Sequence, residues 1–210
     1  MEATEYRWYF LDNYWKYFLQ LESEFANTEK YVTFSPHNKK SSSLEYLLLF
    51  QAACSEIDTV GKAIAKFKNP SFQINAYTNL KKWGYEVQKA YPQLENVKVI
   101  FDDRSYLEPW KNWKYQHKVN LKTGAQSKDL LLCPGKQTPE WWLNYNKVKH
   151  ARAFDIGGSN TNFILANQIN VITSMAALYS LEVLFLRDLG VSGKDRLITR
   201  RGELFSLSPN

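Results

Sequence analysis

The segment 42–67, SSLEYLLLFQAACSEIDTVGKAIAKF, constrains the fold more than any other part of the chain. Ser42 or Ser43 can cap its start, with Glu45 three residues after Ser42 in capping-box spacing, and Pro70 follows its end. At 100° per residue, one wide arc of the predicted helix is apolar, comprising Leu47, Leu49, Phe50, Ala53, Cys54, Ile57, Val60 and Ile64. An apolar arc of this width is typical of a helix that packs in the core of a protein.

The rest of the chain continues the helical pattern, with one interruption. Further helices are predicted at 5–26, at 74–90, from Thr138 and Pro139 to Gly157, and from about Asn160 to Asp188. The segment 97–103, VKVIFDD, alternates as a strand does. The sequence therefore predicts a mainly α fold, a bundle of four to five helices with a small β-hairpin or loop insertion between helices 3 and 4. We expect a single domain at 1–190, with the insertion at about 97–137, and a basic, at best partly ordered tail at 191–210.

Composition excludes several classes of protein. The chain has 210 residues, two cysteines and three histidines, and no CxxC or Cys/His cluster, so neither a metal nor another cofactor is expected. The N-terminus lacks the pattern of a signal peptide, and polar residues interrupt the apolar stretch 171–186. We therefore expect a cytoplasmic protein with no membrane span. A net charge of +6 is compatible with a nucleic-acid partner, although many proteins without one share it.

Polar residues occupy positions where three of the predicted helices should be apolar. Glu56 falls inside the apolar arc of 42–67, where a buried carboxylate needs a partner. The stripe formed by Trp141, Tyr145 and Val148 continues onto Arg152. We expect one polar cluster that contains Glu56, Asn146, His150, Arg152 and Asn170. The alternative is that Glu56 pairs with Arg152, His150 is half exposed, and the asparagines cap helices or are solvated.

Three strings in order, ACSEID, YNKVKHAR and ANQINVITSMAALYSL, resemble the HEPN superfamily, named for higher eukaryotes and prokaryotes nucleotide-binding. The chain is most similar to bacterial HEPN-like proteins with a YNxxKHxR helix, and the resemblance covers 44–67 and 138–188. Catalytic members of this superfamily are metal-independent ribonucleases, usually dimeric, that attack RNA through the ribose 2′-hydroxyl. Asn146 and His150 match their polar and histidine positions, and Tyr145 stands where those members have arginine.

The resemblance implies an RNA-directed protein of bacterial stress or phage defence, with a homodimer as the expected assembly. As a ribonuclease it would use His150 as acid or base, Asn146 to orient the histidine or bind phosphate, and Arg152 or Lys149 as the cation. Glu56, Asn167 and Asn170 would support this site. The alternative is a catalytically inactive HEPN-like module that dimerises or binds a protein partner, and Tyr145 favours it.

Aromatic residues and lysines alternate in the insertion and suggest further RNA contacts. Trp110 and Trp113 could stack on unpaired bases, and Lys114 and Lys147 could contact phosphates. The alternative is that the two tryptophans anchor a hairpin on the bundle and the lysines are solvated.

Overall fold

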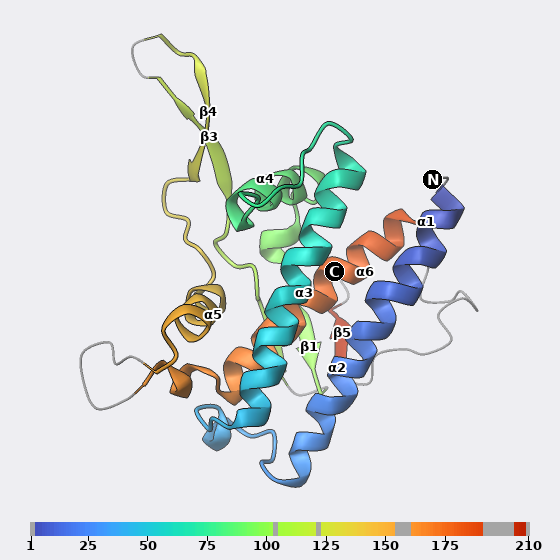
Figure 1. The fold of residues 1–210 in the computed structure, drawn as a ribbon, viewed down its shortest axis with the longest axis vertical. Coiled ribbons are helices and arrows are strands. Elements are labelled where there is room, and N and C mark those ends of the chain that lie inside the picture. Colours follow the sequence, from blue (N-terminus) through green and yellow to red (C-terminus); the bar gives the residue numbers. More distant parts are fainter. Residues whose placement is uncertain (1–2, 103–104, 121–122, 154–160, 191–203, 209–210) are drawn as a thin grey trace.

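The computed structural model describes residues 3–102, 105–120, 123–153, 161–190 and 204–208, and these are mainly α-helical, as predicted (Figure 1). The N-terminal helix is one continuous rod with a π-helical turn, η1, at its centre. Within the described residues the long helical elements are α1 (Ala3–Phe10), η1 (Leu11–Trp15), α2 (Lys16–Asn27), α3 (Leu44–Lys68), α4 (Leu80–Ala90), α5 (Glu140–Ala151) and α6 (Gln168–Asp188).

The core of the bundle lies where α3 packs against α6 (Figure 1). The predicted apolar arc of α3 is confirmed, since all eight of its side chains are buried. Helix α6 is apolar on nearly every side. It has the length and hydropathy of a membrane span, but 83% of its most apolar window is buried inside the protein, which makes it a core helix. The α1–α2 rod covers one side of the α3–α6 pair, and α4 and α5 cover the other (Figure 1).

Side-chain caps fix the starts of α3, α4 and α6, and two of these starts differ from the predicted ones. Helix α3 is capped by Ser43, one of the two predicted candidates, whose hydroxyl accepts from the backbone N–H of Tyr46. Helix α4 begins at Leu80, six residues later than the predicted start at 74, because Asn79 caps it. Pro139 is the N-cap of α5, in place of Thr138. Asn167 caps α6, which begins at Gln168, eight residues after the predicted start near 160. The predicted end of the preceding helix, at Gly157, lies outside the described residues.

A small antiparallel sheet lies against the bundle. Its strands are β1 (Val99–Phe101), β2 (Ser105–Leu107) and β5 (Phe205–Leu207), in the order β2-β1-β5. Strand β5 comes from the segment predicted as a basic tail, so part of that segment belongs to the fold. The buried ring of Phe205 explains this, since its centroid lies 5.3 Å from that of Phe101 and 6.2 Å from that of Phe18.

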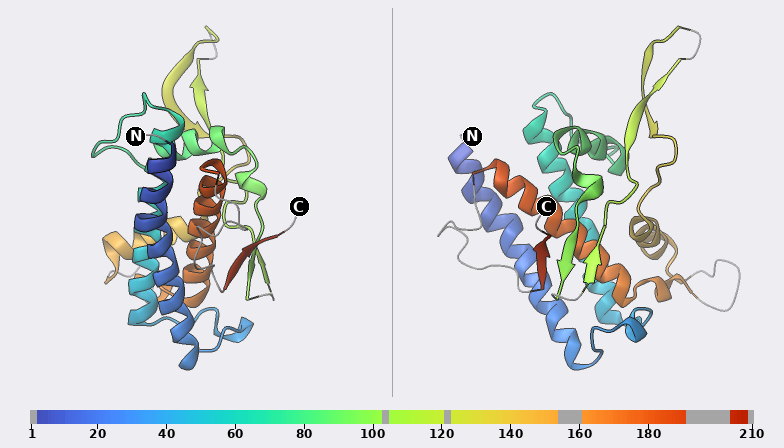
Figure 2. Two further views of the ribbon diagram at one scale, coloured as in Figure 1. Left: turned by 90° about the vertical axis from the view of Figure 1, so that its right-hand side faces the viewer. Right: turned by 180° about the vertical axis from the view of Figure 1, so that it is seen from behind.

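The other part of the predicted insertion forms a hairpin, β3 (Tyr115–Val119) and β4 (Gln126–Leu132). The hairpin projects from the body beyond α4 (Figure 2). The chain that leads into it carries Trp110 and Trp113, which are 0% and 1% exposed and stack with ring centroids 4.5 Å apart. The indole N–H of Trp110 donates to Ser180 of α6 at 2.9 Å. These contacts attach the root of the hairpin to the core.

Candidate functional site

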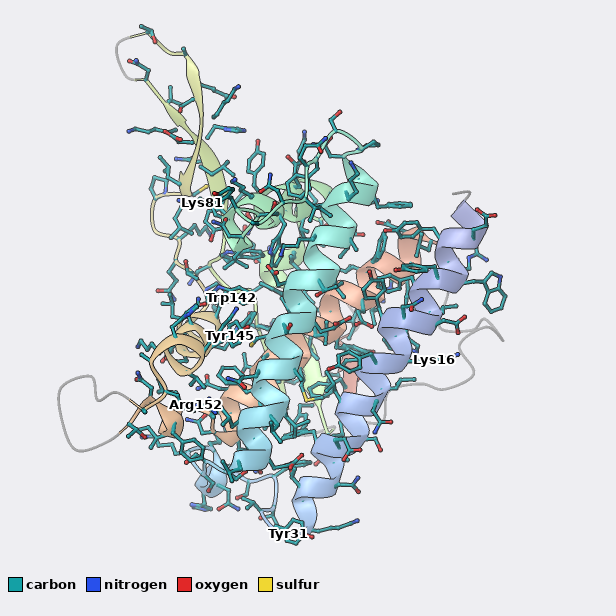
Figure 3. All side chains as sticks on the ribbon, in the orientation of Figure 1. Lys16, Tyr31, Lys81, Trp142, Tyr145 and Arg152 are labelled. Carbon is teal, nitrogen blue, oxygen red and sulfur yellow. The ribbon has the colours of Figure 1, made fainter. Side chains whose placement is uncertain are left out.

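A polar cleft of about 460 Å³ lies between α3, α4, α5 and the start of β3. Asp58 lines it from α3, Asn79 and Lys81 from the start of α4, and Asn146 and Lys149 from α5. Figure 3 shows Lys81 beside α4 and, below it, Trp142 and Tyr145 on α5. Elements far apart in the sequence thus bring an acid, two amides and two lysines to one place.

The face of α5 that lines the cleft follows from its helical spacing. Trp142 and Tyr145 are buried, with ring centroids 5.4 Å apart, and anchor this side of the helix. Asn146 and Lys149 each follow one of these aromatic residues by four positions, so they lie on the same side, one turn further along. The ammonium group of Lys149 lies 5.5 Å from the centroid of the Tyr145 ring, a cation–π contact that keeps it at the cleft.

The start of α4 contributes positive potential. Asn79 caps this helix, with its side-chain oxygen 3.3 Å from the backbone nitrogen of Lys82. Lys81 therefore stands in the first helical turn, where the partial positive charge of the helix terminus is concentrated. The ammonium groups of Lys81 and Lys149 have no acidic partner among the described residues. Both are exposed and free to meet an anion.

Asp58 does not cancel this positive charge, because its carboxylate is already bonded. One oxygen accepts from the indole N–H of Trp83 at 2.8 Å, and the other pairs with Lys62 on the next turn of α3. Burial raises the pKa of Tyr145 to about 12, with smaller contributions from Cys54 and Asp58, so its phenol stays protonated at neutral pH. Apart from the paired Asp58, the cleft is lined by cations and neutral groups, and it suits a phosphate-bearing ligand.

The structure separates the residues predicted as catalytic. Asn146 and Lys149 line the cleft as expected. His150 and Arg152 are exposed at the end of α5 and do not form its walls, and Lys147 is exposed as well. His150 follows Asn146 by four residues and so lies one turn beyond the cleft on the same side of the helix.

The predicted cluster around Glu56 is wrong. Its carboxylate interacts with Tyr14 and Tyr17 of the N-terminal rod and with Glu182 of α6, and no ion pair joins it to Arg152 among the described residues. Glu56 and Asp58 lie on nearly opposite sides of α3, because residues two positions apart differ by 200° around the helix axis. Helix α5 packs on the Asp58 side, and the rod packs on the Glu56 side.

Asn167 and Asn170 serve structural roles beside a second cleft, of about 580 Å³, lined by the other side of α5. Asn167 caps α6 by accepting from the backbone N–H of Asn170 at 3.2 Å. The amide of Asn170 donates to the carbonyl of Leu165 at 2.8 Å, and that of Asn144 lies 3.5 Å from the Asn170 side-chain oxygen. The alternative interpretation, that the asparagines of the cluster cap helices or are solvated, does not hold for Asn170, which is buried and bonded to Leu165. Neither Asn167 nor Asn170 lines the first cleft.

The proposed stacking role of Trp110 and Trp113 is contradicted by their burial. Neither indole has a face open to a base, and both anchor the hairpin, as the alternative interpretation had it. Lys114 is exposed, and its ammonium group lies 3.9 Å from Glu95.

Sequence reasoning missed Lys81 and Asp58. Asp58 lies outside the apolar arc of its helix, and nothing in its own segment places it beside another element. The predicted start of α4 is six residues too early to put Lys81 in a first turn. For Lys81, the available signal was Asn79, a residue type that can cap a helix and that precedes Leu80 and Lys81.

Groups that could bind a metal or act through a thiol are few in the described part of the chain, with two free cysteines, Cys54 and Cys133. No group of three or more His, Cys, Asp or Glu side chains is placed there to hold a metal ion. Burial raises the pKa of the Cys54 thiol well above its ordinary value, so that thiol stays protonated. In comparisons with known proteins, no family model, no curated protein and no solved structure matches the chain.

Proposed function

We propose that the protein is a HEPN-like, RNA-directed protein of the bacterial cytoplasm that binds single-stranded RNA in the cleft between α3, α4 and α5. One observation carries this proposal: two lysines that have no acidic partner within the described residues, Lys81 and Lys149, reach the same polar cleft from different helices. One of them belongs to the YNKVKHAR helix on which the resemblance rests. The homodimer expected from the resemblance is part of the same proposal.

A polyanion suits these donors better than a single phosphate does. The two ammonium groups, the Asn146 amide and the Ser55 hydroxyl are distributed over three separate helices, α3, α4 and α5. Consecutive phosphates of one strand can use such a row, and an amide can also hydrogen-bond a ribose hydroxyl. Lys147 and His150 extend the polar surface of α5 beyond the cleft.

Replacing Lys81 and Lys149 together with alanine is expected to weaken RNA binding roughly tenfold. It should also lower the salt slope of log affinity by about 1.4, since each lost phosphate contact with a single strand removes about 0.7. Fluorescence anisotropy with a labelled single-stranded RNA across a NaCl series measures both quantities. Lys16→Ala is the matched control, because Lys16 is exposed on α2, far from α5 (Figure 3). Equal affinities for the double variant and the control would reject the cleft.

Cleavage of the bound RNA is expected to depend on His150 and to survive EDTA. The histidine lies one turn beyond Asn146, where it can act on a strand that leaves the cleft, and a second copy would supply the facing groups. A gel assay of a mixed single-stranded RNA with EDTA, comparing wild type with His150→Ala, measures this. Loss of cleavage in a variant that still binds RNA supports the ribonuclease. Binding without cleavage in both proteins would leave an RNA-binding module, and no binding in either would favour the scaffold that binds a protein partner.

A further inference from the structure

The β3–β4 hairpin extends from the body without a helix or another strand beside its outer half (Figures 1 and 2). From Lys118 to Asp129 every described side chain except that of Ser127 is exposed. A two-stranded hairpin is marginally stable on its own in water. An extension of this kind buries almost none of its own surface, so a role in reaching a partner explains it better than a role in stability.

The root of the hairpin is fixed to α4, the helix that also provides Lys81. The Gln88 side chain accepts from the backbone N–H of Tyr115 and donates to the carbonyl of Trp113, both at 2.9 Å. Two residues further along β3, the His117 ring meets the Tyr85 ring at a centroid distance of 4.7 Å. The hairpin therefore leaves the body in a fixed direction.

The hairpin also starts at the cleft. Tyr115, the first residue of β3, is one of the residues that line it. Strand β3 has five residues and so extends about 16 Å from that wall. A ligand strand that leaves the cleft past Tyr115 meets the hairpin.

The outer half of the hairpin has the chemistry of a phosphate-binding surface. In its described residues between 114 and 132, the charged side chains are Lys114, Lys118 and Lys128 against a single acid, Asp129. Lys118 and Lys128 have no ion pair within the described part of the chain. Exposed amides of Gln116 and Gln126 lie on the same hairpin and can hydrogen-bond sugars or phosphates.

We propose that the β3–β4 hairpin is an RNA-binding arm, on which Lys118 and Lys128 contact the phosphates of the strand that leaves the cleft beside Tyr115. The inference rests on the proposed function and adds to it the path and the length of the bound RNA. The partner is a single strand of RNA, as in the proposed function.

The test compares two RNA lengths, about 5 and about 15 nucleotides, near the two ends of the range of site sizes of single-strand binders. Lys118→Ala with Lys128→Ala is expected to lower affinity for the longer RNA about fivefold to tenfold, and to lower its salt slope by about 1.4. Affinity for the shorter RNA, which fills the cleft alone, should not change. Lys16→Ala is again the control, and thermal melting verifies that the exposed substitutions leave the fold intact.

Two results would overturn the arm, and they differ from a failure of the proposed function. The first result is that Lys118→Ala with Lys128→Ala binds both RNA lengths as the wild type does, while Lys81→Ala with Lys149→Ala binds both more weakly. The RNA site in the cleft is then supported, and the RNA-binding arm is wrong. If the double variant changes the sedimentation of the protein and leaves RNA binding unaltered, the arm pairs with a second copy. Failure of the wild type to bind either RNA rejects the proposed function itself.

Discussion

Replacing Trp113 with alanine is expected to lower the free energy of unfolding by about 3–5 kcal/mol. The indole is 1% exposed and contacts the rings of Trp110, Trp83 and Tyr115 at centroid distances of 4.5, 5.9 and 5.7 Å. A Cβ atom on Gly84 would lie 2.5 Å from the same ring, so α4 approaches it as closely as a glycine permits. Truncation would leave a cavity that this arrangement cannot close.

Denaturant unfolding followed by circular dichroism measures this loss. Trp8→Ala is the control, because Trp8 is 48% exposed on α1, and we expect its effect to be near 0.5 kcal/mol. A Trp113→Ala protein of wild-type stability that binds RNA poorly would restore the base-stacking role and contradict the structural one.

A second large effect is expected at Glu182, the most unusual buried group in the described structure. It is 0% exposed, and neither carboxyl oxygen has a hydrogen-bond partner within the part of the chain that the structure describes. Burial raises the pKa of Glu182 well above its ordinary value, and the nearby carboxyl of Glu56 raises it further. Burial also raises the pKa of Glu56 to about 7. At neutral pH Glu182 is therefore protonated. Glu56 and Glu182 together lower the stability of the region where the α1–α2 rod, α3 and α6 meet.

The sign of the pH dependence follows from these directions. Both carboxyls bind protons more tightly in the folded chain than in the unfolded chain, where the ordinary pKa is 4.5. The folded protein therefore holds more protons above pH 4.5, and stability falls as pH rises through about 7. Below 4.5 both groups are protonated in both states, and their ionisation costs nothing.

Glu182→Leu is expected to raise the free energy of unfolding at pH 8 by about 1–3 kcal/mol, the cost of an unpartnered buried polar group. For a chain of this size that is roughly 2–4 °C in Tm for each kcal/mol. The gain should be smaller at pH 5, where less ionisation has to be suppressed. Glu182→Gln separates the cost of ionisation from the cost of unsatisfied hydrogen bonds, because the amide cannot ionise but still lacks hydrogen-bond partners. A lower Tm for Glu182→Leu at pH 8 would show that the carboxyl group has a stabilising partner.

The parts of the fold that were predictable depend on local pattern. The apolar arc of α3 and its Ser43 cap were readable because both lie within one helix, and so was the buried stripe of Trp141, Tyr145 and Val148 on α5. Which helix would pack against which arc was not readable. Glu56 faces the N-terminal rod because that rod occupies one side of α3, and no residue within 42–67 indicates it. The arrangement expected for a HEPN protein remains a prediction.

In the candidate site, too, the residues that could be predicted are those that depend on spacing within one helix. Asn146 and Lys149 were found because their spacing on a single helix places them on one face. Lys81 and Asp58 come from other elements, and only packing brings them to the cleft. Trp110 and Trp113 looked like surface stacking residues because lysines surround them in the sequence, yet the hydrophobic effect places these large rings in the core and leaves the lysines outside.

The most direct test of the RNA cleft is photochemical. A single-stranded RNA of about 15 nucleotides, within the usual range of site sizes, would carry 4-thiouridine, and mass spectrometry would identify the peptides crosslinked to it. The proposed path predicts crosslinks in the peptides that contain Lys81, Tyr115 and the α5 stretch 142–149. Crosslinks confined to the α1–α2 rod, with none on α5, would contradict it.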